Sequence, residues 1–387
     1  MNILEEIQNC SVEWKELGEV VFTVTSPVKL AKKQYQLTGR IPIVDQGEQF
    51  IAGYTDNEKY LEKDEYIIFG DHSEHIKFVD FAFVQGADGL KILKPRRGIN
   101  AKYLYYCVCN FYKKEGNYKR HWSNAKITLI PILPLKIQEK IVQILDKMTE
   151  YVTELTSELT SRKKQYSYYR DKLLSFEDEV YQVEWKTLDA VSERTSNISW
   201  NKIGDDEKFK YIDLSSVDRV SNKITETTSI TKSTAPSRAQ KIVKSNDIIL
   251  GTTRPTLKRF TKITDDYNDQ ICSTGFYVFR TNGEVLPNYV YHIFSSSDFY
   301  KYLEENQSGA SYPAISDALV KKYKIPVPSL EIQSRIVQVL DNFDMVCNDL
   351  NIGLPKEIEL RQKQYEYFRE KLLTFVAEGE YTESRVE

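Results

Sequence analysis

Apolar side chains recur at alternating steps of three and four residues in two separate stretches of the chain. The first stretch contains Met148, Val152, Leu155, Leu159, Tyr166, Tyr169 and Leu173, with Arg162 at its one polar position. The second contains Ile336, Leu340, Phe343, Cys347, Leu350, Leu354, Ile358, Tyr365, Phe368 and Leu372, with Arg361 at the matching polar position. Such a heptad seam stays on one face of a helix only when the helix packs lengthwise against a partner. The pattern therefore predicts two long helices, residues 134–180 and 329–376, that pair as an antiparallel coiled coil.

The two stretches are also copies of each other in sequence. The first begins IPILPLKIQEKIVQILDKM and ends RKKQYSYYRDKLLSF, whereas the second begins KIPVPSLEIQSRIVQVLDNF and ends RQKQYEYFREKLLTF. The tetrapeptide Val12-Glu13-Trp14-Lys15 returns in the same way as Val183-Glu184-Trp185-Lys186. A long internal repeat fixes the architecture before any other feature. It predicts the order globular region, long helix, globular region, long helix, with a pseudo-twofold relation between the halves.

The globular regions, residues 1–133 and 181–328, are expected to mix strands and helices in an α+β arrangement. Short β-rich runs bounded by Gly and Asp are IPIVDQG, EYIIFGD, VDFAFVQ and LKILK in the first region and KYIDLSSV, DIILGTTR and GFYVFR in the second. Residues 101–112 and 289–305 have helical spacing. Between the repeated flanks the two interiors share almost no sequence, which indicates a duplicated scaffold whose binding regions have diverged.

The second long helix departs from the first in its middle. Its opening and closing motifs lie four residues farther apart, around Asn351-Ile352-Gly353-Leu354-Pro355. Four extra residues are a stutter, and a Gly followed by a Pro near a new helix start favours a break. We therefore expect an interruption near 353–355 and a terminal tail over 377–387.

Composition limits the function more than it defines it. The 387 residues carry a net charge of −3, so any polyanion-binding surface must be local. Five cysteines without paired spacing are typical of cytosolic thiols. The N-terminal MNILEEIQNC lacks an apolar core, and no stretch approaches the ~20 apolar residues of a membrane span. These features predict a cytoplasmic protein without a membrane partner.

Motifs for catalysis are missing from the chain. There is no GxxxxGK[ST] phosphate loop, no GxGxxG, no Asn- or Asp-Pro-Pro-aromatic methyltransferase motif and no nucleophile elbow. His72 and His75 flank Glu74, but no third kind of metal ligand stands nearby. We expect no catalytic residue and no metal site.

Basic residues gather in one cluster within each globular region. Lys91, Lys94, Arg96 and Arg97 are followed by Lys113, Lys114, Lys119 and Arg120; in the second region the cluster is Arg238, Lys241, Lys244, Arg254, Lys258 and Arg259. Small hydroxyl residues beside Arg and Lys suit phosphate contacts, while Arg, Asn and Gln can recognise base edges. One cluster in each duplicated half favours nucleic-acid binding.

The IQxxIVxxLD opening, the QYxYYRDKLL close, their repetition and the EWKxLxxV motif of both globular regions resemble one family along essentially the whole chain. It is the specificity (S) subunit of type I restriction-modification systems. The resemblance implies that each globular region is a target-recognition domain for one half of a bipartite site in double-stranded DNA, with the helices setting the spacer. It implies two methyltransferase (M) subunits docked on the chain and motor-nuclease (R) subunits joined through that core. S-adenosylmethionine, ATP and Mg would belong to those partners, so this chain is expected to bind no cofactor.

Polar residues in Gly-bounded loops can reach a DNA groove while the sheet holds them rigid. In the first domain we expect DNA contacts from Gln46, Gln49, Asp71, His72, Gln85, Lys94, Arg96 and Arg97. In the second domain we expect them from Arg238, Lys241, Thr252, Thr253, Arg254, Lys258, Arg259, Ser311 and Tyr312. Tyr168 and its counterpart Tyr367 lie off the seam and are candidates for contact with a methyltransferase or with a recognition domain.

Other interpretations remain open at this point. The chain could serve a related system in which methyltransferase and nuclease are fused. A protein of another class, a coiled-coil scaffold whose globular ends bind proteins, would show no DNA binding even with a methyltransferase present. An enzyme is the weakest option because the catalytic motifs are missing.

Overall fold

The computed structural model of the chain describes residues 3–87, 89–176 and 183–374. The chain folds into two compact units, one formed by Met1–Glu154 with Glu359–Glu387 and the other by Leu155–Ile358. Each unit therefore joins one globular region to parts of both long helical segments. The expected 377–387 tail, and residues 177–182 and 375–376 at the expected boundaries, lie outside the described residues.

The described residues of the first globular region form two four-stranded sheets and a two-stranded ribbon. One sheet has the order β2-β9-β6-β7, all antiparallel, and the other has the order β3-β8-β4-β5, in which β8 runs parallel to β3 and β4. The elements are α1 (Ile3–Gln8), β1 (Glu13–Glu16), α2 (Leu17–Val20), β2 (Val21–Val24), β3 (Lys29–Leu30), η1 (Lys32–Gln34), β4 (Ile41–Val44), β5 (Gly53–Thr55), β6 (Tyr66–Gly70), β7 (Ile76–Val79), β8 (Val84–Gly86), β9 (Leu90–Pro95), α3 (Ala101–Phe111), α4 (Trp122–Ala125) and β10 (Leu129–Ile132).

The second globular region has the same number of sheets but a different strand order. Its sheets are β13-β12-β17-β14, with β12 parallel to β17, and the antiparallel β16-β15-β18. The elements are β11 (Glu184–Thr187), η2 (Trp200–Lys202), β12 (Phe209–Ile212), η3 (Leu214–Ser216), β13 (Thr228–Ile230), β14 (Ala239–Val243), β15 (Ile248–Gly251), η4 (Pro255–Leu257), β16 (Phe260–Lys262), η5 (Asp265–Tyr267), β17 (Gln270–Ser273), β18 (Phe276–Phe279), α6 (Pro287–Ser295), α7 (Ser297–Asn306), α8 (Asp317–Lys322) and β19 (Lys324–Val327).

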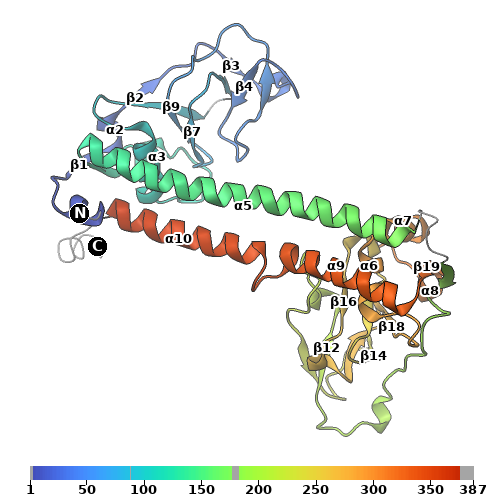
Figure 1. Cartoon of the computed structure of the whole chain (residues 1–387). Helices are drawn as coiled ribbons and strands as arrows, with labels where there is room; N and C mark the ends of the chain where they lie inside the picture. The colour runs from blue at the N-terminus through green and yellow to red at the C-terminus, as the bar shows by residue number, and fades with distance from the viewer. Residues whose placement is uncertain (1–2, 88, 177–182, 375–387) are drawn as a thin grey trace. The chain divides into compact units, whose positions relative to one another are not determined.

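Long helices connect these regions, which confirms the α+β class with two helical segments. The first segment is α5 (Leu135–Ser175), a single helix of 41 residues and about 60 Å. The second consists of α9 (Leu330–Asn348) and α10 (Leu354–Thr374), separated by a short non-helical stretch that is visible in Figure 1.

Within each unit the helices bury the apolar seam against each other. In the first unit Leu145 of α5 shares a core with Leu372 of α10, while Tyr151, farther along α5, lies beside Arg361, which comes earlier in α10. The direction of packing is therefore antiparallel. In the second unit the rings of Tyr166 and Tyr169 stack on Phe343 of α9, with centroid distances of 6.2 and 5.8 Å.

The break between α9 and α10 has a local cause. The Asp349 carboxylate ends α9 by accepting hydrogen bonds from the N–H groups of Asn351 and Ile352, at 2.7 and 3.0 Å. A Cβ on Gly353 would lie 2.6 Å from the carbonyl oxygens of both Met345 and Asp349, so only glycine fits this close approach. Leu350, which the heptad pattern assigns to the seam, is 54% exposed because it lies in this break and not on a helix.

The repeated motifs fasten each long helix to its globular region by the same hydrogen bonds. Gln138 donates to the Leu133 carbonyl at 2.7 Å and accepts from Asn100 N–H at 2.8 Å, just before α3. Gln333 donates to Pro328 O at 2.9 Å and accepts from Leu286 N–H at 2.9 Å, just before α6. Both glutamine side chains are fully buried. The repeated Ile-Gln dipeptide is therefore a structural requirement of the junction.

Two further ties repeat although the sequences around them do not. The Tyr103 hydroxyl of α3 donates to Pro131 O at 2.9 Å, and the Tyr289 hydroxyl of α6 donates to Pro326 O at 3.0 Å. The aspartates of the repeated Leu-Asp pairs also accept from these helices: Asp146 from Tyr106 and Lys102, Asp341 from His292 and Asn288. The globular interiors thus share α3 and α6 as equivalent docking helices, a relation that the sequence alone did not indicate.

Some sequence expectations differ from the structure in detail. The helical run 289–305 is two helices, because Ser296 ends α6 and caps α7 by accepting from Phe299 N–H at 3.3 Å. The expected strand VDFAFVQ is interrupted, with β7 ending at Val79 and β8 beginning at Val84. In KYIDLSSV the strand stops at Ile212 and a 3₁₀ turn follows.

Candidate nucleic-acid interface

Two of the expected DNA-contacting residues of the first domain meet at the ends of β4 and β6. The Gln46 side chain accepts a hydrogen bond from His72 N–H at 3.2 Å, and the backbone carbonyl oxygen of Gln46 lies 3.1 Å from Nδ1 of His75. Gly89 packs against both, since a Cβ there would lie 2.8 Å from the His72 ring and 2.9 Å from Nε2 of Gln46, and its φ of +86° also favours glycine. Gln49 is exposed on the same loop as Gln46. The structure therefore brings Gln46 and His72 together, a contact that their separation in the sequence could not reveal.

Asp71 and Gln85 do not fit the expected DNA-contacting role. Asp71 is buried and accepts from Trp122 N–H at 2.8 Å, which holds the first turn of α4. Gln85 is 3% exposed within β8. Both residues are buried within the domain, so neither side chain is exposed to a DNA groove.

Lys94, Arg96 and Arg97 lie at the opposite end of β9 from His72, because Leu90 pairs with Gly70 while Pro95 pairs with Val21. Lys94 forms an ion pair with Asp64. The Arg96 guanidinium lies 4.1 Å from the centre of the exposed Phe22 ring, and Arg97 is exposed. This basic end of the β2–β9 pair is a surface separate from the Gln46–His72 loops.

In the second domain, Arg254 and Tyr312 are brought together from loops far apart in the sequence. Arg254 N–H donates to Pro313 O at 2.6 Å, and Thr253 forms a β-bridge with Ala314. The Arg254 guanidinium lies 4.4 Å from the centre of the Tyr312 ring, which is 71% exposed, and Ser311 is exposed beside it. Arg254 and Lys258 both have left-handed backbones, with φ of 49° and 58°, around the turn η4. Such conformations cost about 1–2 kcal/mol each for residues other than glycine, and they cluster at functional sites.

The other expected residues of this domain divide into exposed and internal groups. Arg238 and Lys258 are exposed, and Lys258 Nζ lies 4.2 Å from the centre of the Tyr300 ring. The remaining three residues bind other parts of the domain. Thr252 donates to Gly275 O at 2.9 Å, and Arg259 donates to Leu214 O. Lys241 donates to Phe276 O at 2.6 Å and forms an ion pair with Asp317 at 2.7 Å. Thr252 and Lys241 therefore do not fit a DNA-contacting role, because their polar atoms are already engaged within the fold. Arg259 is held by its bond to Leu214 O, while its Nε atom is buried without a hydrogen-bond partner among the described residues.

Tyr168 and Tyr367 project from α5 and α10, with 61% and 56% of their surfaces exposed. Each packs edge-on against its neighbouring ring, Tyr169 or Phe368. Among the residues that the structure describes, neither ring belongs to a hydrophobic core cluster, so both remain candidates for partner contacts.

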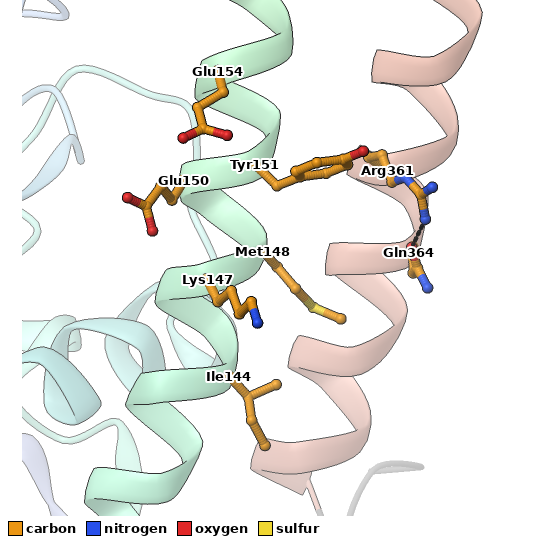
Figure 2. Close-up of a pocket in the computed structure, with 8 residues that line it drawn as sticks. All are labelled: Ile144, Lys147, Met148, Glu150, Tyr151, Glu154, Arg361 and Gln364. Atoms are coloured by element: carbon orange, nitrogen blue, oxygen red, sulfur yellow. Dashed lines mark hydrogen bonds between the residues drawn. The ribbon is translucent and has the colours of Figure 1, made fainter.

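An open groove of about 500 Å³ lies between α5 and α10 in the first unit (Figure 2). Ile144, Met148 and Tyr151 form its apolar side. Arg361, at the polar position of the seam, lies 5.3 Å from the centre of the Tyr151 ring and donates to the Gln364 side chain at 2.9 Å. Because the groove is open, the charged Arg361 side chain can occupy a position at which the heptad pattern otherwise places an apolar residue.

The described part of the chain holds no cluster of three or more His, Cys, Asp and Glu that could bind a metal ion. Across the same residues, no helix has both the length and the apolar character that crossing a bilayer requires.

Glu74, in the turn between β6 and β7, is a buried residue with a left-handed backbone (φ 56°) and 3% of its surface exposed. Burial raises the pKa of a carboxyl group, but hydrogen bonds from the Tyr112 hydroxyl and from the N–H groups of Glu115 and Gly116 outweigh it, so the pKa of Glu74 is lowered. Because the folded-state pKa lies below the unfolded value, this carboxylate stabilises the domain above about pH 4.3. That contribution is lost as the pH falls through the folded-state pKa.

Replacing Glu74 by Gln is therefore expected to lower the free energy of unfolding by about 1–3 kcal/mol at pH 7, because a buried amide cannot satisfy the same donors. The difference from the unsubstituted chain should shrink as the pH falls below ~4. Urea unfolding at several pH values measures it, with exposed Glu62→Gln as the control. An equal loss of stability at all pH values would show that the carboxylate charge is not the cause.

Comparisons with known proteins agree with this arrangement. Residues 184–360 match the type I restriction modification DNA specificity domain. The chain is 33% identical over 405 residues to the type I restriction enzyme EcoR124I/EcoR124II specificity subunit of Escherichia coli, covering 97% of both chains. It is 29% identical to a putative type I restriction enzyme specificity subunit of Haemophilus influenzae, covering 95% of this chain and 97% of the relative.

A solved structure of the S subunit of a type I restriction-modification system from M. genitalium shares the fold. It superposes with a TM-score of 0.59 over 94% of this chain and 96% of the other, at 16% identity. The identity along the Escherichia coli relative confirms the resemblance carried by the repeated motifs. The chain therefore belongs to the specificity subunits of type I restriction-modification systems, whose function is the recognition of a DNA sequence.

Proposed function

We propose that each globular domain recognises one half of a bipartite target in double-stranded DNA, and that the helical segments fix the number of unspecified base pairs between the halves. The observation that carries this proposal is the repeated fastening of unlike domains. Gln138 and Gln333 form the same bonds to the residues just before α3 and α6, whereas the two domains differ in sequence and in the strand order of their sheets. A duplicated frame with different exposed loops suits the recognition of two different half-sites.

The Arg254–Tyr312 surface is the best-formed candidate for direct recognition in the second domain. An arginine can donate two hydrogen bonds to O6 and N7 of guanine in the major groove. In the first domain, Gln46 and His72 occupy the corresponding role, and Arg96 and Arg97 contact phosphates. These assignments rest on exposure, charge and preformed geometry.

The chain itself is proposed to be non-catalytic. Two methyltransferase subunits dock on it, through surfaces that include Tyr168 and Tyr367, and the motor-nuclease subunits join that core. S-adenosylmethionine, ATP and Mg are bound by those partners. Because the substrate is cellular DNA, the assembled complex acts in the cytoplasm.

Co-expression with the cognate methyltransferase subunit, followed by long-read mapping of methylated bases, tests this function. The expected result is one asymmetric bipartite motif with a fixed spacer. A chimaera that carries another subunit's residues 183–328 in place of its own should change one half of the motif and leave the other half unaltered. A continuous motif, or a change in both halves, would contradict the division of labour between the domains.

Lys258→Ala is expected to weaken binding to all duplexes to a similar degree, because an ammonium beside a phosphate carries no sequence information. Removing one phosphate contact should lower the slope of log K against log[salt] by about 0.9. Dissociation constants of the methyltransferase complex at several salt concentrations measure both effects. Exposed Lys208, which follows Asp205, Asp206 and Glu207, provides the matched control. A changed methylation motif in Lys258→Ala would instead assign this residue to base recognition.

A further inference from the structure

The segment between α3 and α4, residues 113–120 (KKEGNYKR), forms a second surface of the first domain and carries four residues of the basic cluster described from the sequence. All eight of its residues are exposed, and Tyr118 is 88% exposed. An exposed loop ordinarily has few constraints on its conformation. This one is held by several buried groups.

Glu74 holds the first half of the loop. Its Oε1 accepts from the Tyr112 hydroxyl at 2.6 Å and from Glu115 N–H at 2.8 Å, and its Oε2 accepts from Gly116 N–H at 2.8 Å. Burying a carboxylate is costly unless hydrogen bonds compensate it. Here the three hydrogen bonds compensate the burial of Glu74, and two of them fix the exposed backbone of Glu115 and Gly116.

Two histidines hold the second half. The fully buried His121 places Nε2 2.8 Å from Asn117 O, and His72 places Nδ1 3.0 Å from Lys119 O; each ring nitrogen donates, because a carbonyl oxygen can only accept. The Tyr118 ring stacks on the His72 ring with a centroid distance of 5.2 Å and an interplanar angle of 17°. The exposed tyrosine is therefore fixed beside the Gln46–His72 loops.

The charge of the loop identifies what it would bind. The loop carries four basic residues, Lys113, Lys114, Lys119 and Arg120, and one acidic residue, Glu115, which pairs with Lys119. Lys113, Lys114 and Arg120 are exposed on the same loop as Tyr118. Basic side chains around a fixed, exposed aromatic ring suit a nucleic-acid backbone with a sugar or base packed on the ring.

We propose that the 113–120 loop is a DNA-contacting element of the first domain, in which Lys113, Lys114 and Arg120 bind phosphates and Tyr118 packs on a sugar or base next to His72. This inference rests on the proposed function and extends it to residues outside the Gln46–His72 loops. Glu74 and His121 act as positioning residues for the loop.

The test uses the chain in complex with its methyltransferase subunit and a duplex that carries the motif found by methylation mapping. Combined Lys113→Ala, Lys114→Ala and Arg120→Ala should lower the salt slope by about 2.7. Tyr118→Ala should weaken binding about 10-fold at an unchanged slope, and Tyr118→Phe, which keeps the ring, should restore it. Lys59→Ala with Lys63→Ala is the control, because these exposed lysines alternate with Glu58 and Glu62 and form no basic patch.

The outcomes separate the inference from the function on which it rests. Unchanged affinity and slope in both loop variants, with methylation still directed by the unsubstituted chain, would overturn the inference alone. Loss of methyltransferase binding by the variants would overturn it too, by assigning the loop to protein docking. Absence of any motif with the unsubstituted chain would instead reject the proposed function.

Discussion

Arg254→Ala is expected to remove most methylation at the cognate sites while leaving the domain folded. The guanidinium stands against the exposed Tyr312 ring, and the backbone is tied to Pro313 O, so the side chain is already oriented before DNA arrives. A good bidentate contact from Arg to a base discriminates by about 1–3 kcal/mol, which is about 5- to 150-fold in binding. In competition with the rest of a genome, a loss of that size leaves the specific sites largely unmodified.

The left-handed backbone of Arg254 makes this substitution easy to interpret. Alanine has the same Cβ as arginine, so Arg254→Ala adds no backbone strain to that already present. A melting temperature close to that of the unsubstituted chain is expected, and exposed Arg219→Ala serves as a matched control. Arg254→Lys keeps the positive charge but not the two-pronged donor, so it separates base recognition from phosphate binding. If Arg254→Ala leaves the mapped motif and its extent of modification unaltered, Arg254 does not recognise DNA.

Periodicity and repetition allowed the helical frame to be predicted from sequence, because a buried seam constrains every third or fourth residue. The Ile-Gln and Leu-Asp pairs were recognisable as repeats, but their reason appears only in the structure, where Gln138 and Asp146 bind groups on or just before α3. The equivalence of α3 and α6 could not be predicted, since one uses Lys102 and Tyr106 where the other uses Asn288 and His292. Different donor side chains on α3 and α6 therefore bind equivalent aspartates, Asp146 and Asp341.

The candidate interface was less predictable than the frame. Asp71 and Thr252 look like exposed loop residues in the sequence, yet each is buried because a partner distant along the chain, Trp122 N–H or Gly275 O, satisfies it. Tyr118 was missed for the opposite reason. A tyrosine between two helices is expected to be at least partly buried. Tyr118 is instead exposed in a fixed position, because Glu74 binds the backbone of Glu115 and the His72 ring stacks on the tyrosine ring.

Leu350 shows the limit of heptad reasoning. The apolar pattern continues through it, but the helix does not, because Gly353 and the Asp349 carboxylate close a turn at that point. A spacing pattern reports which face a residue would occupy if the helix existed there. It does not report where hydrogen bonding stops.

Inserting one more Thr-Ser-Glu-Leu after Leu159 is expected to widen the spacer between the two half-sites by at least one base pair. α5 already carries the related tetrapeptides Val152-Thr153-Glu154-Leu155 and Thr156-Ser157-Glu158-Leu159 within one uninterrupted helix. Four residues lengthen a helix by ~6 Å and come close to one full turn, so the inserted leucine falls on the same seam as Leu155 and Leu159. The seam is preserved while the distance along it grows. One base pair corresponds to about 3.4 Å of duplex.

Long-read methylation mapping of cells that express the insertion variant with the methyltransferase subunit gives the spacer directly, with both half-sites expected to keep their sequences. The same tetrapeptide inserted after Gly204, in an exposed turn of the second domain, controls for added mass and charge without lengthening a helix, and should leave the spacer unaltered. Deleting Thr156–Leu159 should narrow the spacer by the same step. A variant that methylates efficiently with the original spacer would show that α5 does not set the distance between the half-sites.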